Sequence, residues 1–307
     1  MRMNKSELTD QLSDRIRPDK AKERWLCILS SMLEVTFRFL TQEESSCFRQ
    51  TTSGNSERNC GIMRNIRLDI CYDGTRYRGW QRLSGTDNTI QGKLETALSR
   101  ILGETIEISG SGRTDAGVHA KGQVANFHCE STMSCREILE QLRRYLPEDI
   151  GIYSCKDCSD RFHARLNAKE KTYQYRIWNS EAPQVFDRRY MAFFPEKLDV
   201  DAMMQAAQHM CGEHDFGAFC GNPKFKKSTV RFIRQIRIMP REDGELRIEI
   251  TGNGFLHNMV RIIVGTLIEV GRGERKSDSI PGLFGGKRAE AGFLAPAQGL
   301  CLLEVEY

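Results

Sequence analysis

The amino-acid sequence predicts an α+β fold made of two similar halves that share a mainly antiparallel sheet. Segments with strand-like alternation and segments with helical spacing follow one another in the order strand, helix, strand, strand, helix, strand. This series occurs twice along the 307 residues. No low-complexity linker separates the two passages, so we expect them to share one sheet or one cleft.

The first half is predicted to span residues 63–166. Apolar and polar side chains alternate in its opening strand, and apolar residues then recur at helical spacing after Asn88 or Thr89, either of which suits a helix cap. We expect strands at 66–72, 106–108 and 124–128 and helices at 90–102 and 138–146, the second helix ending before Pro147. This order is the split βαβ pattern of ferredoxin-like and RRM-like domains.

The second half is predicted to span residues 167–307 and to repeat the pattern. We expect strands at 173–178, 232–239, 246–251 and 300–305 and helices at 202–211 and 259–270. The expected architecture is therefore two ferredoxin-like halves around a central basic cleft.

Residues 1–62 differ from the rest of the chain. They are polar and lack the regular rhythm, which begins at Met63, although 25–40 would suit one amphipathic helix. We expect an extension that is disordered or that reflects a mis-assigned start, and in both cases one that catalysis does not need. The run 25–40 is too short and too charged to span a membrane, and with no secretory signal we expect a cytoplasmic location.

The composition gives little sign of a metal or a cofactor. The 11 cysteines are scattered, and only Cys155 and Cys158 have CxxC spacing, without a second pair at zinc-site distance. No phosphate-binding or dinucleotide fingerprint is present. The net charge is only +4, but basic residues cluster locally, which suits either solvated surfaces or a basic groove for RNA. We expect no metal and no cofactor.

The stretch 112–119 is the most informative segment. It reads Gly-Arg-Thr-Asp-Ala-Gly-Val-His, follows a predicted strand, and places Arg113 and Asp115 between glycines. Such a loop is able to aim a carboxylate and a guanidinium into a cleft. An ordinary Asx turn, in which Asp115 bonds its own backbone, explains the spacing equally simply.

Three further segments accompany this loop in a fixed order. They are Tyr72-Asp73-Gly74 with Gly79-Trp80-Gln81, then Phe162-His163-Ala164-Arg165 with Lys171-Thr172-Tyr173, and then Gly254-Phe255-Leu256-His257-Asn258-Met259-Val260-Arg261. Each alone is weak, but the ordered set resembles the TruA family of tRNA pseudouridine synthases. The resemblance runs from about Met63 to Tyr307 and implies the pseudouridine synthase fold.

The resemblance implies three catalytic residues. Asp115 matches the family's nucleophile, and Arg261 matches the basic residue that pairs with it. Arg261 lies on an apolar helix face, where a charge needs a partner, and Asp115 would supply one. Tyr173 matches the tyrosine that packs against the target base and handles a proton, although its alternation with Tyr175 also fits an ordinary core residue.

Four residues are candidates for substrate binding. Arg113 matches an arginine that helps to hold the flipped-out nucleotide, and Tyr173, Arg165 and His119 complete the set. His119 and His257 also suit structural hydrogen bonding. The implied substrate is the anticodon stem-loop of tRNA, at tRNA positions 38, 39 and 40 in the family, bound by a homodimer.

The implied reaction moves uracil from an N1 to a C5 glycosidic bond and needs no cofactor. Whether Asp115 attacks the sugar, attacks the base or assists a glycal route stays open. A non-catalytic RNA-binding protein with two RRM-like halves is the main alternative, although no RNP-type aromatic run is present. A retaining glycosidase would need a second carboxylate in a matching motif, which the sequence lacks.

Overall fold

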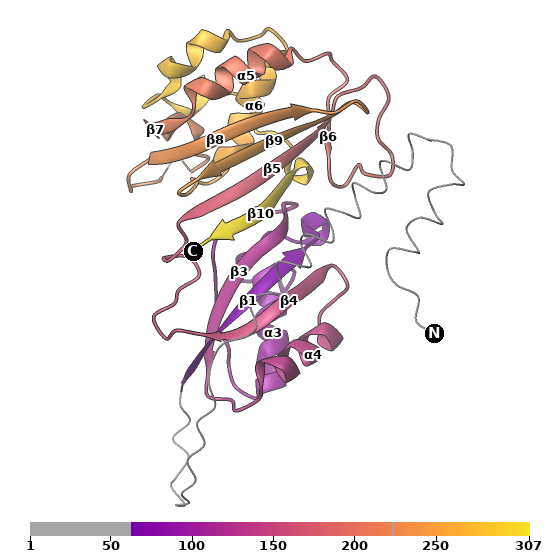
Figure 1. The fold of residues 1–307 in the computed structure, drawn as a ribbon, viewed down its shortest axis with the longest axis vertical. Coiled ribbons are helices and arrows are strands. Elements are labelled where there is room, and N and C mark those ends of the chain that lie inside the picture. The colour runs from indigo at the N-terminus through magenta and orange to yellow at the C-terminus, as the bar shows by residue number, and fades with distance from the viewer. Residues whose placement is uncertain (1–62, 223) are drawn as a thin grey trace, which may run out of the picture. The chain divides into compact units, whose positions relative to one another are not determined.

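The structure, a computed structural model, describes residues 63–222 and 224–307, so the expectations for residues 1–62 lie outside it. The described residues belong to one compact unit, shown in colour in Figure 1. Within them, ten strands form one continuous sheet in which most neighbouring strands are antiparallel. The predicted α+β class and the shared, mainly antiparallel sheet are confirmed.

The first half follows the expected series of elements. It contains strands β1 (Arg64–Tyr72), β2 (Ile108–Gly110), β3 (His119–Cys129) and β4 (Ile150–Cys158), and helices α3 (Ile90–Leu102) and α4 (Cys135–Tyr145). The strand order is β4-β1-β3, and β2 pairs with the far end of β3. Thr89 caps α3 by accepting the N–H of Gly92, and Ser134 forms a capping box with Glu137 at the start of α4.

The second half repeats this arrangement. It contains strands β5 (Glu170–Trp178), β6 (Ala192–Phe193), β7 (Gly212–Asp215), β8 (Val230–Pro240), β9 (Glu245–Gly252) and β10 (Leu300–Glu306), and helices α5 (Val200–His209) and α6 (Met259–Gly271). Its main strands lie in the order β10-β5-β9-β8. If the main strands of each half are numbered one to four along the chain, both halves have the order four, one, three, two across the sheet. The very short β6 and β7 were not predicted, because two to four residues hold too little periodicity.

The two halves join where β10 lies parallel to the start of β3. Cys301 and Leu302 pair there with His119 and Ala120, on the edge of β3 that faces away from β1. The chains approach closely, since a Cβ added at Gly122 would lie 2.1 Å from the carbonyl oxygen of Leu303. We call this junction the seam.

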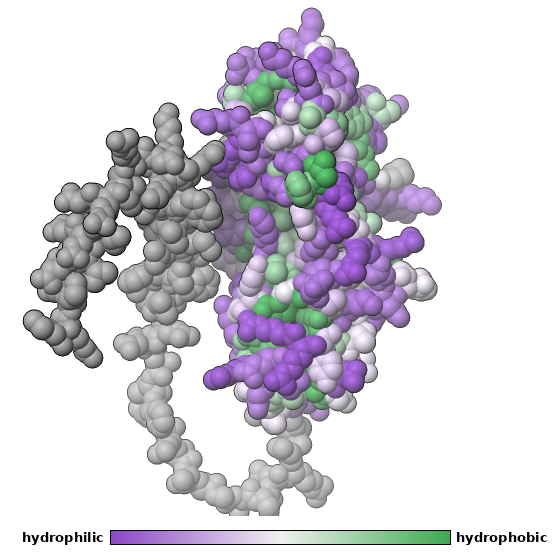
Figure 2. Space-filling view, turned by 90° about the vertical axis from the view of Figure 1, so that its right-hand side faces the viewer, coloured by the Kyte–Doolittle hydropathy of each residue, from purple (hydrophilic) through white to green (hydrophobic). Residues whose placement is uncertain are grey.

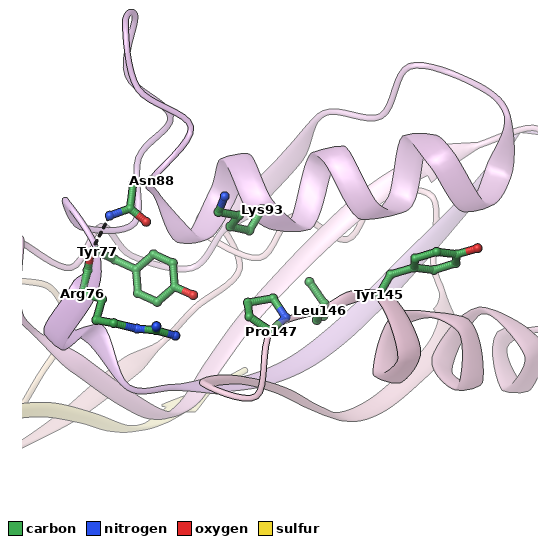
Figure 3. A pocket seen from close by; sticks show the side chains of 7 residues that line it. All are labelled: Arg76, Tyr77, Asn88, Lys93, Tyr145, Leu146 and Pro147. Carbon is green, nitrogen blue, oxygen red and sulfur yellow. Dashed lines mark hydrogen bonds between the residues drawn. The ribbon is translucent and has the colours of Figure 1, made fainter.

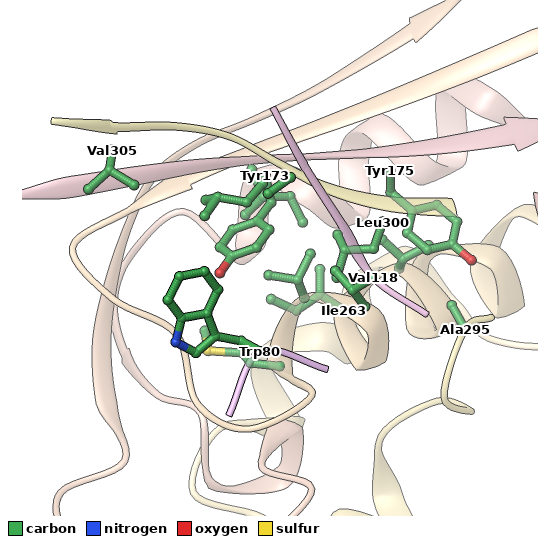
Figure 4. Packing of buried hydrophobic residues seen from close by; sticks show 14 of the residues in the cluster. Trp80, Val118, Tyr173, Tyr175, Ile263, Ala295, Leu300 and Val305 are labelled. Atoms are coloured by element: carbon green, nitrogen blue, oxygen red, sulfur yellow. The ribbon is translucent and has the colours of Figure 1, made fainter. Parts of the chain in front are cut away.

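One hydrophobic cluster crosses the seam. Trp80 and Val118 of the first half lie beside Tyr173, Ile263 and Leu300 of the second (Figure 4). Of these residues, Ile263 belongs to α6, which is buried along most of its length. The surface is mostly hydrophilic on the face drawn in Figure 2, with apolar residues in small separate patches. The halves are therefore held together by a shared core.

Candidate active site

The loop between β2 and β3, residues 111–118, ends at the seam, where His119 begins β3, and we call it the Asp115 loop. Buried groups of the first half fix its course. The hydroxyl of Ser111 donates to the side-chain oxygen of Gln123 at 2.6 Å, and the amide of Gln123 donates to the carbonyl of Gly112 at 3.0 Å. The hydroxyls of Tyr72 and Thr114 lie 2.8 Å apart. These bonds set the position of the backbone immediately before Asp115.

The segment that contains Gly79 and Trp80 supports the loop from the other side. The N–H of Trp80 donates to the carbonyl of Thr114 at 3.0 Å. Gly79 has a φ of +95°, and a Cβ there would lie 2.7 Å from the same carbonyl oxygen. Only glycine suits this position, because the backbone is left-handed and the loop passes too closely for a side chain.

Asp115 faces two basic side chains of the second half. Its carboxylate lies 3.5 Å from Nη1 of Arg261 and 3.6 Å from Nε2 of His257. The backbone turn at Asp115 is closed by the N–H of Val118, which donates to the Asp115 carbonyl at 3.1 Å. The carboxylate itself is turned toward the second half, so the geometry differs from the Asx turn considered above.

Arg261 is held in place by its position on α6. Its Nε donates to the carbonyl of Ala295 at 2.7 Å, which leaves the other end of the guanidinium for Asp115. Its side chain is 13% exposed and that of Asp115 is 26% exposed. At 3.5 Å the pair is looser than a bidentate salt bridge, so the carboxylate keeps lone pairs free for a substrate.

A cleft of about 400 Å³ opens beside this pair. Eight of the ten residues that line it have polar side chains, and the lining comes from both halves: Arg78, Gln81, Leu83, Arg113, Thr114, Asp115, Ala116, His257, Asn258 and Arg261. The cleft thus combines one carboxylate with four basic side chains. An anionic ligand with a polar ring would suit it, since the arginines can bind phosphate and the ring can approach Asp115.

Tyr173 lies deeper, under the start of the Asp115 loop. Its ring packs edge-on against Phe255 at 5.2 Å between centroids, and a Cβ at Gly112 would lie 3.7 Å from its hydroxyl. Burial, together with the nearby Tyr72 and the negative charge of Asp115, raises the pKa of Tyr173 well above its usual range. The phenol therefore keeps its proton at neutral pH.

The other predicted binding residues lie in different surroundings. Arg113 is exposed and lines the cleft. Arg165 is also exposed, but it lies near Lys171 and is not part of the cleft wall. The structure thus brings Asp115, Arg261 and Arg113 together and leaves Arg165 to one side.

His119 does not join this group. Its ring is buried at the start of β3, where Nδ1 accepts the N–H of Gly74 at 3.1 Å and Nε2 contacts the carbonyl of Arg189 at 3.0 Å. Burial lowers the pKa of His119 in spite of the neighbouring Asp73, which suits the neutral ring that these two bonds require. Both ring nitrogens already bind the protein, which favours the structural hydrogen bonding that the sequence also allowed for His119, and substrate binding by His119 stays a prediction.

Sequence reasoning did not select several cleft residues. Arg78 belongs to one of the local clusters of basic residues and was given no role, and His257 was expected to suit structural hydrogen bonding, yet His257 is half exposed and faces Asp115. Gln81 and Leu83 come one and three residues after Trp80. Because Trp80 contacts Thr114 of the Asp115 loop, this closeness in sequence is the signal that identifies them as cleft residues.

The described residues contain no group of three or more His, Cys, Asp or Glu side chains placed to hold a metal. Cys155 and Cys158 both lie on β4, and their odd spacing directs them to opposite faces of the sheet. A second hollow is lined by Arg76, Tyr77 and Lys93 with the end of α4, and it shares no residue with the Asp115 cleft (Figure 3). None of the helices in residues 63–222 and 224–307 has the length and apolar character needed to cross a membrane.

Known proteins resemble most of the chain. The family model described as tRNA pseudouridine synthase matches residues 70–167 and 206–307. The tRNA pseudouridine synthase A 2 of Bacillus cereus (strain ZK / E33L) is 48% identical over 246 residues, which are 80% of this chain and 100% of that protein. The tRNA pseudouridine synthases A of Bacillus sp. (strain KSM-64) and Acetivibrio thermocellus are 49% and 45% identical over the same shares.

One solved structure is only distantly similar. The crystal structure of a Cbf5-Nop10-Gar1 complex aligns with a TM-score of 0.32 and 11% identity, covering 77% of this chain and 48% of that chain. The family match and the full-length relatives, by contrast, include both the Asp115 loop and the start of α6. The chain belongs to the tRNA pseudouridine synthase family.

Proposed function

We propose that this protein converts uridine to pseudouridine in the anticodon stem-loop of tRNA, with Asp115 as the nucleophile. The observation that carries the proposal is the carboxylate of Asp115, held at the seam within 3.5 Å of Arg261 and open to a cleft lined by Arg78 and Arg113. Membership of the synthase family supports the same activity.

The chemistry requires few groups. The bond from uracil N1 to C1′ of the ribose breaks, a bond from C5 to C1′ forms, C5 loses a proton and N1 gains one, so nothing is oxidised and no group is imported. Arg261 is the countercharge that faces the Asp115 carboxylate in a partly dry site. Because the phenol of Tyr173 keeps its proton at neutral pH, Tyr173 serves first as a flat packing surface and a hydrogen-bond donor. It serves as a base only afterwards.

The target uridine has to leave the base stack before Asp115 can reach it. Extrusion costs a few kcal/mol and is easiest where pairing is weak, as at the end of a stem and in its loop. Arg113 and Arg78 are placed to bind the backbone around the extruded nucleotide, and Arg165 extends the basic surface. The homodimer and the cytoplasmic location stay predictions that rest on resemblance and composition.

The direct test uses tRNA transcripts carrying tritium at C5 of uridine. Pseudouridine formation replaces the C5–H bond, so we expect tritium release and modified uridines that map to the anticodon stem-loop. Binding without release would instead support the non-catalytic RNA-binding alternative. Release from uridines elsewhere in the tRNA would keep the reaction and overturn the proposed target.

A further inference from the structure

Lys171 lies under the start of the Asp115 loop but belongs to the other half. It is the second residue of β5, and its ammonium donates to the carbonyl of Ser111 at 2.6 Å. A Cβ at Gly112 would lie 3.5 Å from this nitrogen and 3.7 Å from the hydroxyl of Tyr173. The amine is therefore close to both the loop and the tyrosine, although it does not line the cleft.

The strand register leaves this amine without an acidic partner. Lys171 pairs with Gly252 on β9 and Val305 on β10, neither of which has a charged side chain. Glu304 pairs instead with Thr172, and alternation places it on the opposite face of the sheet from Lys171. In the described part of the chain, Lys171 forms no ion pair with a carboxylate.

Burial and the nearby positive charge of Arg165 lower the pKa of Lys171 to about 8, from an ordinary 10.5. The titratable neighbours behave differently. Tyr173 on β5 and Tyr307 after β10 have pKa values raised by burial, so both phenols stay neutral at this pH. The loop next to Lys171 contains one acidic residue, Asp115. Among these residues, Lys171 is thus the one whose charge changes near pH 8.

We propose that Lys171 is a positioning residue for catalysis, which fixes the Asp115 loop to the second half by binding the carbonyl of Ser111. Ser111 is already tied to Gln123 within the first half, and Lys171 adds a bond from the second half to the Ser111 carbonyl. A charged ammonium holds a carbonyl more strongly than a neutral amine does. The role of Lys171 rests on the proposed function, because it concerns the position of Asp115 relative to Tyr173.

The charge dependence gives the role a distinct signature. Lys171 is charged below about pH 8 and neutral above it, so a turnover rate that needs the charge is full below this pH and falls above it. The test compares wild type with Lys171→Arg, Lys171→Met and the control Lys169→Met across pH 6 to 10. Lys169 is exposed, and its amine contacts only the carbonyl of Tyr307 at 3.1 Å.

We expect wild-type kcat for pseudouridine formation to fall above about pH 8. Lys171→Arg should move this alkaline limb upward by about one unit or more, because arginine stays charged. Lys171→Met should lower kcat by roughly 10-fold to 100-fold at neutral pH and lose the limb, with little change in tRNA affinity. Lys169→Met should behave like wild type.

Melting curves and circular dichroism show whether each variant folds. If Lys171→Arg does not fold, the pH profile of folded Lys171→Met still tests the role of Lys171, because its kcat should no longer fall above about pH 8. An alkaline limb that persists unchanged in Lys171→Met, or a loss of tRNA affinity with kcat unchanged, would overturn this role alone. A wild-type protein that releases no tritium would overturn the proposed function and this role together.

Discussion

The two halves have the same order of main strands and differ most in the length of the second one. In the second half, β8 extends over Val230–Pro240 and pairs with β9 along most of its length. Its counterpart in the first half, β2, contains only three residues, Ile108–Gly110. Beyond Gly110 the first-half chain leaves the sheet as the Asp115 loop, while the second half keeps a regular strand at the same place.

This difference explains where the site lies. Because β2 is short, the edge of β3 near His119 is free to pair with β10, and the halves become one sheet. The same shortening releases the Asp115 loop at the junction. The second half contributes what the first lacks, namely the buried helix α6 with Arg261 and the strand β5 with Tyr173. Neither half holds a complete site.

The largest effect is expected from removing the charge that the second half supplies. Replacing Arg261 by Met should lower pseudouridine formation on the order of 100-fold or more, since Asp115 loses its countercharge. It should also cost about 1 to 3 kcal/mol of unfolding free energy, because the carbonyl of Ala295 loses its donor. Single-turnover rates and urea unfolding measure the two effects.

Arg261→Lys is the matched comparison. A lysine keeps the charge but cannot bind Ala295 and Asp115 at once as the guanidinium fork does. We expect its activity to fall between those of wild type and Arg261→Met. Activity of Arg261→Met equal to that of wild type would break the proposed division of the site between the halves.

A smaller effect is expected from disturbing the support of the loop within the first half. Gly79→Ala forces a side chain into left-handed backbone against the carbonyl of Thr114, so it should cost about 1 to 3 kcal/mol and shift the Asp115 loop. The control is Gly103→Ala, at φ +73° in open space after α3. Both variants should melt earlier, but only Gly79→Ala should lose kcat. Equal kcat in the two would mean that the loop tolerates the displacement.

The smallest effect concerns the second half away from the seam. Burial of Glu245 on β9 opposes ionisation, but hydrogen bonds and charges from Arg247 and Arg176 outweigh it and hold the pKa of Glu245 at about 2. Its ordinary value is 4.5, so this ion-pair cluster contributes stability above about pH 4.5 and loses it as the pH falls toward 2. Melting temperatures of wild type and Glu245→Gln from pH 2 to 7 should converge at the acidic end. Curves that stay parallel would contradict this dependence.

The sequence was sufficient for most of the elements, because alternation and helical spacing are local signals. A cap of α3 at Asn88 or Thr89 and the start of α6 at Met259 follow from such patterns, and the structure selects Thr89. It was not sufficient for the seam, since nothing local to β3 shows that β10 will pair beside His119. Strand pairing between residues so far apart depends on the whole fold.

The sequence was likewise insufficient for those parts of the site that depend on contacts between residues far apart in the chain. Arg261 was linked to Asp115 because a charge on an apolar helix requires a partner, and the structure places them 3.5 Å apart. His119 was a candidate for substrate binding, and the contacts that the structure gives it, with Gly74 and Arg189, are distant in sequence and were not predicted. Lys171 was part of the Lys171-Thr172-Tyr173 segment but was given no role, since its contact with Ser111 exists only after the halves join.

The most direct test of the account is pseudouridine formation by Asp115→Asn, with Asp160→Asn as the control. Asparagine keeps the size of the side chain but cannot act as the nucleophile, and Asp160 is an exposed acid outside the cleft. We predict that Asp115→Asn folds, binds tRNA with near wild-type affinity and releases no tritium from C5-labelled uridine, while Asp160→Asn keeps full activity. Turnover by folded Asp115→Asn above the protein-free blank would contradict the central claim that this carboxylate, held at the seam, performs the reaction.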